Sequence, residues 1–347
     1  MFRTLIALAA AAIGASAHAL QAVPVVTGLD NPWALAWLPD GRMLVTEKPG
    51  RLRIVSSDGK PGAPLAGLPS IDAKGQCGLL DVAVDPNFAR TRTIFFTFAE
   101  PGLLGNATAV GRAKLEGDKL SEVRTIFSES PKVSSNHHCG SRIAITKDGS
   151  LLVGLGDRFS RKDEAQNPDN QLGKVVRVKP DGSGFEVWSL GHRNIQGAAL
   201  NPETGELWAS EHGPQGGDEI NIVERGKNYG WPLLTFGRNY GSGTRIGDEG
   251  PRKGYEQPLK VWVPSIAPSG MAWLTSERYP GWKGSLFVGA LRGQALVRLV
   301  VEDRKIVGEE RLFTTLGERI RDVRQGPDGY LYLVTDGGKG QVLRVMP

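Results

Sequence analysis

The sequence predicts an all-β fold, a six-bladed β-propeller of four-stranded antiparallel blades. Three observations carry this prediction: one apolar pattern recurs six times, its copies lie about one blade apart, and helix signals are nearly absent. The composition agrees with it, because the 347 residues include 46 Gly and 22 Pro, as a turn-rich chain requires.

Each copy of the pattern predicts a β-hairpin, in which an apolar run leads through an Asp-Gly or Asn-Pro type of turn into a second apolar run. Alternating Val, Leu, Ile, Phe and Tyr suit a pleated, half-buried surface. The copies lie at 36–47, 82–98, 143–157, 198–211, 271–290 and 323–336. One hairpin cannot bury its own apolar face, so we expect the copies to pack against each other.

The spacing of the copies favours a propeller over the alternative, a large β-sandwich or barrel. Equivalent positions are separated by 48, 60, 55, 74 and 52 residues, counted along Trp33, Asp81, Ser141, Gln196, Gly270 and Asp322. A four-stranded blade needs about 40–50 residues, and the excess can lie in loops. A sandwich gives no reason for hairpins to recur in the same phase. Residues 20–347 are therefore predicted to form a single propeller domain.

The first 19 residues predict a secretory signal peptide. Arg3 supplies the positive start, Leu5 to Ile13 the apolar stretch, and Ala17-His18-Ala19 the small-residue cleavage site. The apolar stretch is too short to span a bilayer, and no later segment reaches about 20 uninterrupted apolar residues. We expect a periplasmic or secreted protein without membrane insertion.

Charge and cysteine content narrow the function classes. The formal net charge is +5 without a Lys/Arg block, which gives no support to nucleic-acid binding and suits an anionic small ligand as well. In an oxidising compartment Cys77 and Cys139 can form a bridge, which would tie the tops of two blades together. Two buried thiols are the alternative, and the sequence leaves both open.

Five polar segments interrupt the apolar pattern, and propellers place their ligands on such loops at the mouth of the central channel. The segments are GQCGLLD (75–81), NHHCGSR (136–142), GHRNIQG (191–197), EHGPQGGDEIN (211–221) followed by GKNYGWP (226–232), and ERIRDV (318–323).

The NHHCGSR segment indicates a general base. Two histidines precede a strand, and Asp157 ends the next strand of the same hairpin. A carboxylate near an imidazole fixes its tautomer and raises its basicity. Metal binding by His137 and His138 together is the competing interpretation, but adjacent strand residues point to opposite faces. We therefore prefer His138 as a base.

The ERIRDV segment places Arg319 and Arg321 at strand spacing, so both guanidinium groups project to the same side. Two interpretations stay open. The pair can hold an anion, since Arg binds carboxylates in a bidentate manner, or it can form ion pairs with Asp322 or Glu318.

Two further cations support an anion site. Arg193 lies beside Asn194 in a Gly-flanked connection, and Arg292 follows the strand SLFVGAL. Several cations that converge on one channel imply a multiply anionic ligand.

The EHGPQGGDEIN segment predicts a calcium site, with a polar surface turn as the alternative. Gly213 and Pro214 leave backbone carbonyls that no strand ladder uses. Ca²⁺ binds such carbonyls together with carboxylates, which Asp218 and Glu219 supply nearby.

Taken in order across all six blades, these motifs together with RIRDV and KNYGWP resemble the soluble pyrroloquinoline quinone (PQQ)-dependent sugar dehydrogenases. The resemblance is greatest to the aldose sugar dehydrogenase branch and covers essentially the whole mature chain. It implies a six-bladed propeller that holds PQQ with Ca²⁺ over the channel mouth. It also implies oxidation of aldoses at C1 to lactones, with electrons passed to an external acceptor.

The resemblance implies a role for each matching residue. His138 would take the proton of the anomeric hydroxyl while the C1 hydride passes to the quinone. Asp157 would orient His138, and Arg193 would stabilise developing negative charge. The other positions are Gln76 and His137 for substrate; Asn194, Ser265, Arg292, Arg319 and Arg321 for PQQ; the Gly213 and Pro214 carbonyls for the calcium beside PQQ; and Glu219 with the Tyr229 carbonyl for a second, structural calcium.

Three positions depart from the glucose dehydrogenase branch of this family. His137 stands where that branch has an aspartate, which argues for a broad or different aldose specificity. Arg292 replaces a lysine and Ser265 a threonine. Arginine keeps the positive charge but not the point-donor geometry of lysine.

Two other functions are compatible with a propeller. A calcium-dependent lactonase-like hydrolase would use the metal to activate water, and a non-enzymatic binding propeller would tolerate the repeats. The convergence of arginines favours an anionic cofactor instead. The expected partners are an aldose mono- or disaccharide and an external electron acceptor, and the expected oligomeric state is a monomer or homodimer.

Overall fold

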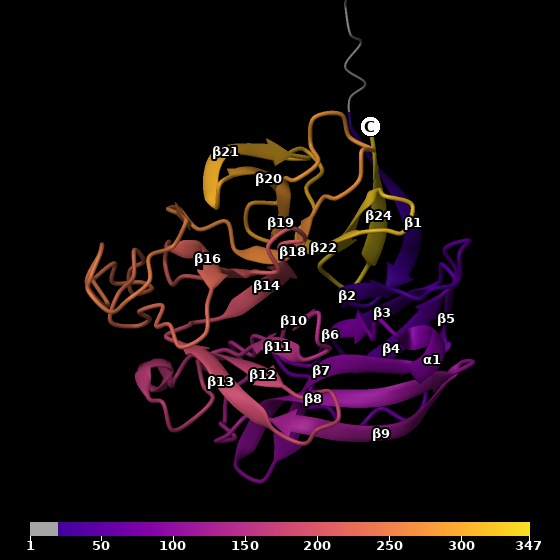
Figure 1. Ribbon diagram of the computed structural model, residues 1–347, viewed down its shortest axis with the longest axis horizontal. Coiled ribbons are helices and arrows are strands. Elements are labelled where there is room, and N and C mark those ends of the chain that lie inside the picture. Colours follow the sequence, from indigo (N-terminus) through magenta and orange to yellow (C-terminus); the bar gives the residue numbers. More distant parts are fainter. Residues whose placement is uncertain (1–19) are drawn as a thin grey trace, which may run out of the picture.

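Six four-stranded sheets form a closed ring in the computed structural model, which describes residues 20–347 (Figure 1). Strand pairs within the sheets are antiparallel. The prediction of a six-bladed β-propeller is confirmed. The predicted signal peptide, residues 1–19, lies outside the described residues.

The blades are numbered along the chain, and the first strand named in each is the inner strand, which contacts the inner strands of both neighbouring blades. Blade 1 contains β2 (Pro32–Trp37), β3 (Met43–Glu47), β4 (Arg51–Val55) and β5 (Pro61–Pro64). Blade 2 contains β6 (Leu79–Val84), β7 (Thr93–Gly102), β8 (Gly105–Glu116) and β9 (Lys119–Ser128). Blade 3 contains β10 (Ile143–Ile145), β11 (Leu151–Gly154), β12 (Lys174–Val178) and β13 (Phe185–Leu190).

The remaining blades follow the same order. Blade 4 contains β14 (Ile195–Leu200), β15 (Leu207–Glu211), β16 (Asp218–Val223) and β17 (Lys260–Trp262). Blade 5 contains β18 (Pro268–Trp273), β19 (Leu286–Ala290), β20 (Ala295–Glu302) and β21 (Lys305–Leu312). Blade 6 contains β22 (Ile320–Gln325), β23 (Leu331–Thr335), β24 (Gly340–Met346) and β1 (Gln21–Leu29). Helix is limited to α1 (Phe88–Thr91) and a 3₁₀ turn (Lys162–Gln166) within the described chain.

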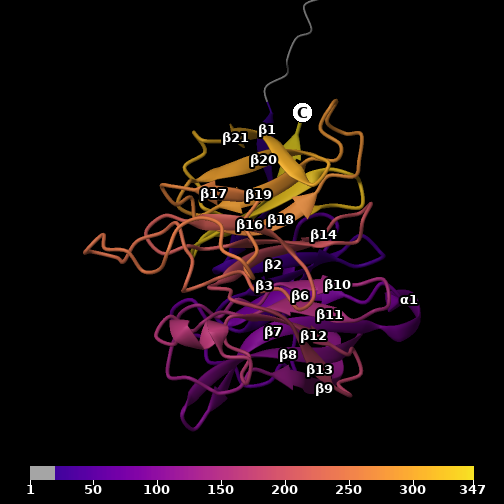
Figure 2. The ribbon, with the colours of Figure 1, turned by 60° about the vertical axis from the view of Figure 1, so that its left-hand side comes forward.

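The six predicted hairpins correspond to the first two strands of the six blades. Their turns join β2 to β3, β6 to β7, β10 to β11, β14 to β15, β18 to β19 and β22 to β23. The ring closes by a device that the repeats do not reveal. The N-terminal strand β1 pairs with β24, from Gln21 opposite Met346 to Leu29 opposite Gly340, so both ends of the described chain share blade 6 (Figure 1). Figure 2 shows the C-terminus next to β1.

The apolar core lies between the blades. One cluster of buried apolar side chains fills each of the six interfaces between neighbouring sheets of the described ring. Strand alternation explains this arrangement, because successive side chains point to opposite faces. In β19, Leu286 and Val288 pack toward blade 4, whereas Phe287 packs toward blade 6. Each blade is thus apolar on both faces and stable only within the ring.

The antiparallel order gives the ring two different ends. The loop end carries the segments that lead into the inner strands and those that follow the second strands. The hairpin end carries the turns between the first and second strands. No helix of residues 20–347 has the length and apolarity needed to cross a membrane.

Candidate active site

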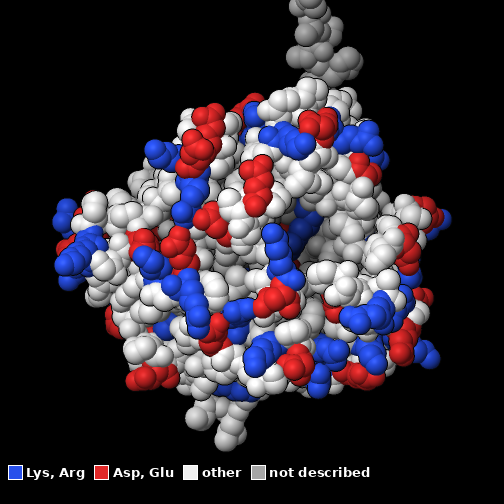
Figure 3. Space-filling view, viewed as in Figure 1, with Lys and Arg blue, Asp and Glu red and all other residues white. Residues whose placement is uncertain are grey.

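The predicted site residues gather at the loop end. Those that lie just before inner strands are Gln76, His137, His138, Arg193, Asn194, Ser265 and Arg319. Those that follow second strands are Asp157, Gly213, Pro214 and Arg292. The others are Arg321 in β22, Glu219 in β16, and Tyr229 in the connection between β16 and β17. The space-filling view in Figure 3 shows one face of the ring, which is hollowed near its centre and carries interspersed basic and acidic side chains.

A buried imidazole–carboxylate pair forms the centre of the site. His138 Nδ1 lies 2.6 Å from Asp157 Oδ1, and both side chains are almost fully buried. The other carboxylate oxygen accepts a hydrogen bond from the indole of Trp231 at 2.7 Å, and the Phe159 amide donates to Oδ1 at 2.7 Å. Since the carboxylate accepts, Nδ1 carries the proton and Nε2 carries the lone pair that a general base needs.

The surroundings favour the charge states that this assignment requires. Burial and the nearby Arg193 charge lower the pKa of His138 below its usual value of 6.5, against the opposing effect of Asp157, so the imidazole is neutral near pH 7. Burial alone would raise the pKa of Asp157. The hydrogen bond to His138 and the charge of Arg193 outweigh it, so its pKa is lowered and the carboxylate stays ionised.

The backbone of His138 is held in an uncommon conformation. Its φ of +50° is in the left-handed region, which costs a non-glycine residue about 1–3 kcal/mol. The Gln76 side-chain oxygen accepts a hydrogen bond from the His138 amide at 2.8 Å. A Cβ atom on Gly156 would lie 1.8 Å from the His138 carbonyl oxygen, so only glycine fits there. His138 thus lies in a loop and not in a strand. The Phe159 ring contacts both histidines, the exposed His137 ring at 5.5 Å and the buried His138 ring at 5.1 Å.

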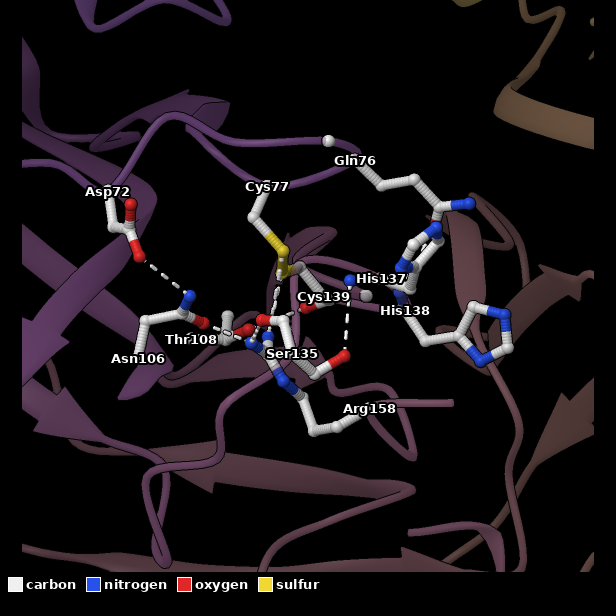
Figure 4. The surroundings of a disulfide bond; sticks show 12 residues. Asp72, Gln76, Cys77, Asn106, Thr108, Ser135, His137, His138, Cys139 and Arg158 are labelled. Atoms are coloured by element: carbon white, nitrogen blue, oxygen red, sulfur yellow. Dashed lines mark hydrogen bonds between the residues drawn. A yellow bond between two sulfur atoms is a disulfide. The ribbon is translucent and has the colours of Figure 1, made fainter. Parts of the chain in front are cut away.

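The two cysteines are joined. Cys77 and Cys139 form a disulfide with a Cα–Cα distance of 5.7 Å (Figure 4). Of the two alternatives that the sequence left open, a disulfide or two buried thiols, the disulfide is correct. The bond connects the loop that enters blade 2 with the loop that enters blade 3.

Arg193 lines the same pocket as His138. Its guanidinium donates to the carbonyl oxygens of His212 at 3.0 Å and Gly213 at 2.7 Å, and lies over the Trp231 ring at 5.3 Å. The Gly213 carbonyl is one of the two that the resemblance assigns to calcium. A carbonyl oxygen has two lone pairs, so one stays available for a metal ion.

Arginines from separate blades converge at this mouth. Burial and the charges of Arg193 and Arg321 together lower the pKa of His212 to about 3. Blades 4 and 6 therefore direct cations to the same place. Arg321 also donates to the Gln196 side chain at 3.0 Å, and Gln196 in turn donates to Asn194 at 3.2 Å.

Arg319 and Arg321 do project to the same side, and both contact Asp336, which follows β23. The distances are 2.9 Å from Arg319 and 3.5 Å from Arg321. The acids that the sequence suggested as partners were wrong. Asp322 instead pairs with Arg142 at 3.0 Å in the channel interior. Asp322 is adjacent to Arg321 in the inner strand β22, and adjacent strand residues point to opposite faces. The shared carboxylate leaves the arginine pair with a net positive charge.

Ser265 and Arg292 are held close to each other. The Arg292 amide donates to the carbonyl of Ile266 at 3.0 Å. The Ser265 hydroxyl donates to Asp218, which also accepts the amides of Ile266 at 2.8 Å and Gly213 at 2.9 Å. The guanidinium of Arg292 is exposed and, among the described residues, has no hydrogen-bond or ion-pair partner. Of the four arginines predicted at the site, it is the one whose guanidinium is unpaired within the described structure.

A pocket of about 330 Å³ opens beside the imidazole–carboxylate pair. Its lining residues are His138, Asp157, Phe159, Lys162, Arg193, Pro214, Trp231, Asn239, Tyr240 and Ile246. Sequence reasoning missed several of these groups. Trp231 lies in the GKNYGWP motif, and a buried indole that needs an acceptor was the signal that could have linked it to Asp157. Phe159 and Tyr240 are large exposed aromatic side chains, and no sequence motif pointed to them.

The residues predicted for the second calcium also meet. A small cavity of about 10 Å³ is lined by Gly213, Glu219 and Tyr229 together with Glu211. Burial and the charge of Glu211 raise the pKa of Glu219 well above its usual value. A cation would relieve this repulsion. No three His, Cys, Asp or Glu side chains of residues 20–347 form a metal-binding group, and the predicted ligands are mostly backbone carbonyls.

Comparison with known proteins identifies the relatives of this site. The family described as Glucose / Sorbosone dehydrogenase matches residues 29–344. The chain belongs to this family. The predicted family is thus confirmed, and the match spans all six blades.

Individual relatives agree. The chain is 44% identical to the aldose sugar dehydrogenase YliI of Escherichia coli over 92% of this chain and 91% of that protein. The crystal structure of the apo-form of the soluble E. coli aldose sugar dehydrogenase matches with a TM-score of 0.91 at 42% identity, over 94% of this chain and 99% of that chain. The PQQ-bound aldose sugar dehydrogenase of Streptomyces coelicolor matches with a TM-score of 0.79 at 28% identity, over 94% and 98%.

Proposed function

We propose that this protein is a PQQ- and calcium-dependent aldose sugar dehydrogenase. It oxidises aldoses at C1 to lactones and passes the electrons to an external acceptor. The observation that carries the proposal is the meeting of the buried His138–Asp157 pair with arginines of blades 4 and 6 at one channel mouth. The similarity to aldose sugar dehydrogenases, one of them PQQ-bound, supports it.

The residues present fit a tricarboxylate cofactor. Arg292 has no partner among the described residues, and Arg319 and Arg321 share one carboxylate. With Asn194 and Ser265 they would hold PQQ. The carbonyls of Gly213 and Pro214 would hold Ca²⁺ beside it, and Glu219 with the Tyr229 carbonyl would hold a structural Ca²⁺. When bound, PQQ supplies the two-electron acceptor and Ca²⁺ the Lewis acid.

The chain itself supplies the proton chemistry. Nε2 of His138 takes the proton of the anomeric hydroxyl, and the ionised Asp157 stabilises the imidazolium that forms. Arg193 places positive charge beside the pocket, where negative charge develops during the reaction.

Gln76 and His137 would contact the sugar. The Gln76 oxygen is occupied by the His138 amide, whereas its NH₂ group is free to donate to a sugar hydroxyl. The exposed Phe159 and Tyr240 rings at the pocket offer further contact area for a mono- or disaccharide. A periplasmic or secreted location and a monomeric or homodimeric state complete the proposal.

The test is reconstitution. Ligand-free protein mixed with PQQ and Ca²⁺ should reduce an artificial dye when an aldose is added, and the same protein without PQQ should not. An absorbance titration measures PQQ binding separately. Absence of dye reduction with several mono- and disaccharides, in protein that binds PQQ, would contradict the proposed activity.

A further inference from the structure

The Cys77–Cys139 disulfide lies directly behind the proposed base. Cys77 follows Gln76 in the chain, and Cys139 follows His138, so the bond joins the two loops that meet at the imidazole (Figure 4). Both sulfur-bearing side chains are buried in the apolar cluster between blades 1 and 2. The His138 loop is therefore anchored on its C-terminal side.

Hydrogen bonds hold the same two loops together on the other side of His138. Gln76 accepts from the His138 amide at 2.8 Å and donates its own amide to the Asn136 carbonyl at 2.8 Å. The disulfide and these two bonds flank a residue whose φ is +50°. Such a backbone conformation persists only where the surroundings over-determine it.

Arg158 connects this arrangement to the carboxylate partner. It follows Asp157 directly and is fully buried. Its Nη1 lies 2.7 Å from Cys139 Sγ and 3.8 Å from Cys77 Sγ, and its Nη2 donates to the Ser135 carbonyl at 2.7 Å and to the Asn106 side chain (Figure 4). One guanidinium therefore ties the Asp157 loop to the disulfide and to the segment before His138.

We propose that the Cys77–Cys139 disulfide and Arg158 act as a positioning clamp, which holds His138 against Asp157 in the geometry for proton abstraction. The clamp rests on the proposed function. The sulfurs and the guanidinium lie behind the pocket and are not among its lining residues, so they act through His138. Without the clamp, the His138 loop relaxes, the imidazole becomes hydrated, and its alignment is lost.

The first test is the double variant Cys77→Ala/Cys139→Ala. In ligand-free protein, NMR titration of the His138 ring, assigned by comparison with His138→Gln, should show a higher pKa than in the wild type, because burial lowers that pKa in the clamped loop. In the PQQ-loaded enzyme, kcat should fall about 10- to 100-fold while PQQ affinity is unchanged.

A matched control separates positioning from general stability. Tyr279 lies at the hairpin end, where its hydroxyl donates to the Val345 carbonyl at 2.8 Å and accepts from the Leu331 amide at 2.9 Å. Tyr279→Phe should lower the melting temperature and leave kcat and the His138 titration unchanged. If the cysteine variant likewise changes only the melting temperature, the proposal that the disulfide positions His138 is wrong. Loss of PQQ binding in the cysteine variant would also overturn it.

Arg158→Lys decides the matter if the cysteine variant does not fold. It keeps the disulfide and the charge, but an ammonium group cannot reach the sulfur and the Ser135 carbonyl together. We expect a raised His138 pKa and a reduced kcat, and the wild-type titration and rate in this variant would refute the clamp. If the wild type proves inactive toward sugars, the proposed function fails, whereas the ligand-free titration still tests the positioning of His138.

Discussion

The two ends of the propeller satisfy their polar groups in different ways. At the hairpin end, turn residues bond to their own neighbours in sequence. Asp85, Asp148, Asn201 and Asp328 each accept the amide of the residue two positions later, at 2.8–3.3 Å. Such turns are specified by a few adjacent residues, so the same arrangement recurs in blades 2, 3, 4 and 6.

At the loop end, polar groups are buried and their partners are distant in sequence. Asp157 bonds to Trp231 across 74 residues, and Arg321 bonds to Gln196 across 125. Backbone strain gathers there too. Of the twelve non-glycine residues with positive φ in the described chain, eight lie at this end: Asn31, His138, Ser141, Arg158, Phe159, Ala267, Gln294 and Phe313. The difference indicates that adjacent residues specify the hairpin turns, whereas contacts between different blades hold the site residues in place.

The sharpest test of this comparison is the removal of the imidazole at the loop end. His138→Ala should leave PQQ binding intact and lower the rate of cofactor reduction about 10²- to 10⁴-fold, the usual contribution of a general base. Stopped-flow absorbance after mixing loaded enzyme with an aldose measures this rate. Unchanged reduction would remove His138 from the mechanism.

Asp157→Asn should have the next largest effect, through the pH dependence. Oxidation needs neutral His138, so kcat/KM falls as the pH drops through its pKa, which burial and Arg193 place below 6.5. Asp157 raises that pKa, so its neutralisation should move the acidic limb to still lower pH. The plateau should fall about 10²-fold, because the imidazolium loses its counter-charge. If the acidic limb of the kcat/KM profile moved to higher pH instead, this role of Asp157 would be contradicted.

The arginine pair offers a comparison within the loop end. The Arg321 side chain is 12% exposed and that of Arg319 is 48% exposed, so a charge-assisted bond to a cofactor carboxylate should be stronger from Arg321. Arg321→Gln should weaken PQQ binding about 10-fold in an absorbance titration, and Arg319→Gln less. An equal or larger loss from Arg319→Gln would reverse the ranking.

The sequence was most informative where interactions are local. The hairpin turns, the blade count and the adjacency of His138 to a hairpin that ends near Asp157 all follow from patterns within about 20 residues of chain. The motif set then identified the family, because the motifs occur in a fixed order. Arg319 and Arg321 were also placed correctly on one side by strand alternation.

The partners of those groups could not be predicted, because they depend on ring closure. Asp336 reaches the arginines from the end of the neighbouring strand, and the choice between Asp322 and Asp336 depends on which acid faces the channel interior. The disulfide needs two loops of different blades at a Cα separation of 5.7 Å. The pairing of β1 with β24 could not be predicted either, because the sequence repeats correspond only to the first two strands of each blade.

One buried carboxyl group at the loop end, that of Glu129, should make the free energy of unfolding fall as the pH rises. Burial raises the pKa of Glu129 to about 7, and its Oε1 has no hydrogen-bond partner within the described structure. Because the folded protein binds this proton more tightly than the unfolded chain does, Glu129 contributes stability at pH values below about 4.5, the pKa in the unfolded chain. This contribution is lost as the pH rises through 7. Glu129→Gln should therefore raise the free energy of unfolding by about 1–3 kcal/mol at pH 8 and change little at pH 4. Urea unfolding at both pH values checks the sign, and equal effects at the two would contradict it.

The smallest effect is expected at the hairpin end. Asp148 accepts hydrogen bonds from Thr146 and from the Ser150 amide, and the first of these lowers its pKa to about 2. The turn is thus stabilised above about pH 4, and the contribution is lost as the pH falls toward 2. Because the side chain is 55% exposed, solvent screening limits the contribution to less than about 1 kcal/mol. Asp148→Ala should lower the free energy of unfolding by that small amount and leave PQQ affinity and kcat unchanged. A loss of sugar oxidation in this variant would mean that the hairpin end shapes the site, and the distinction between the two ends would no longer hold.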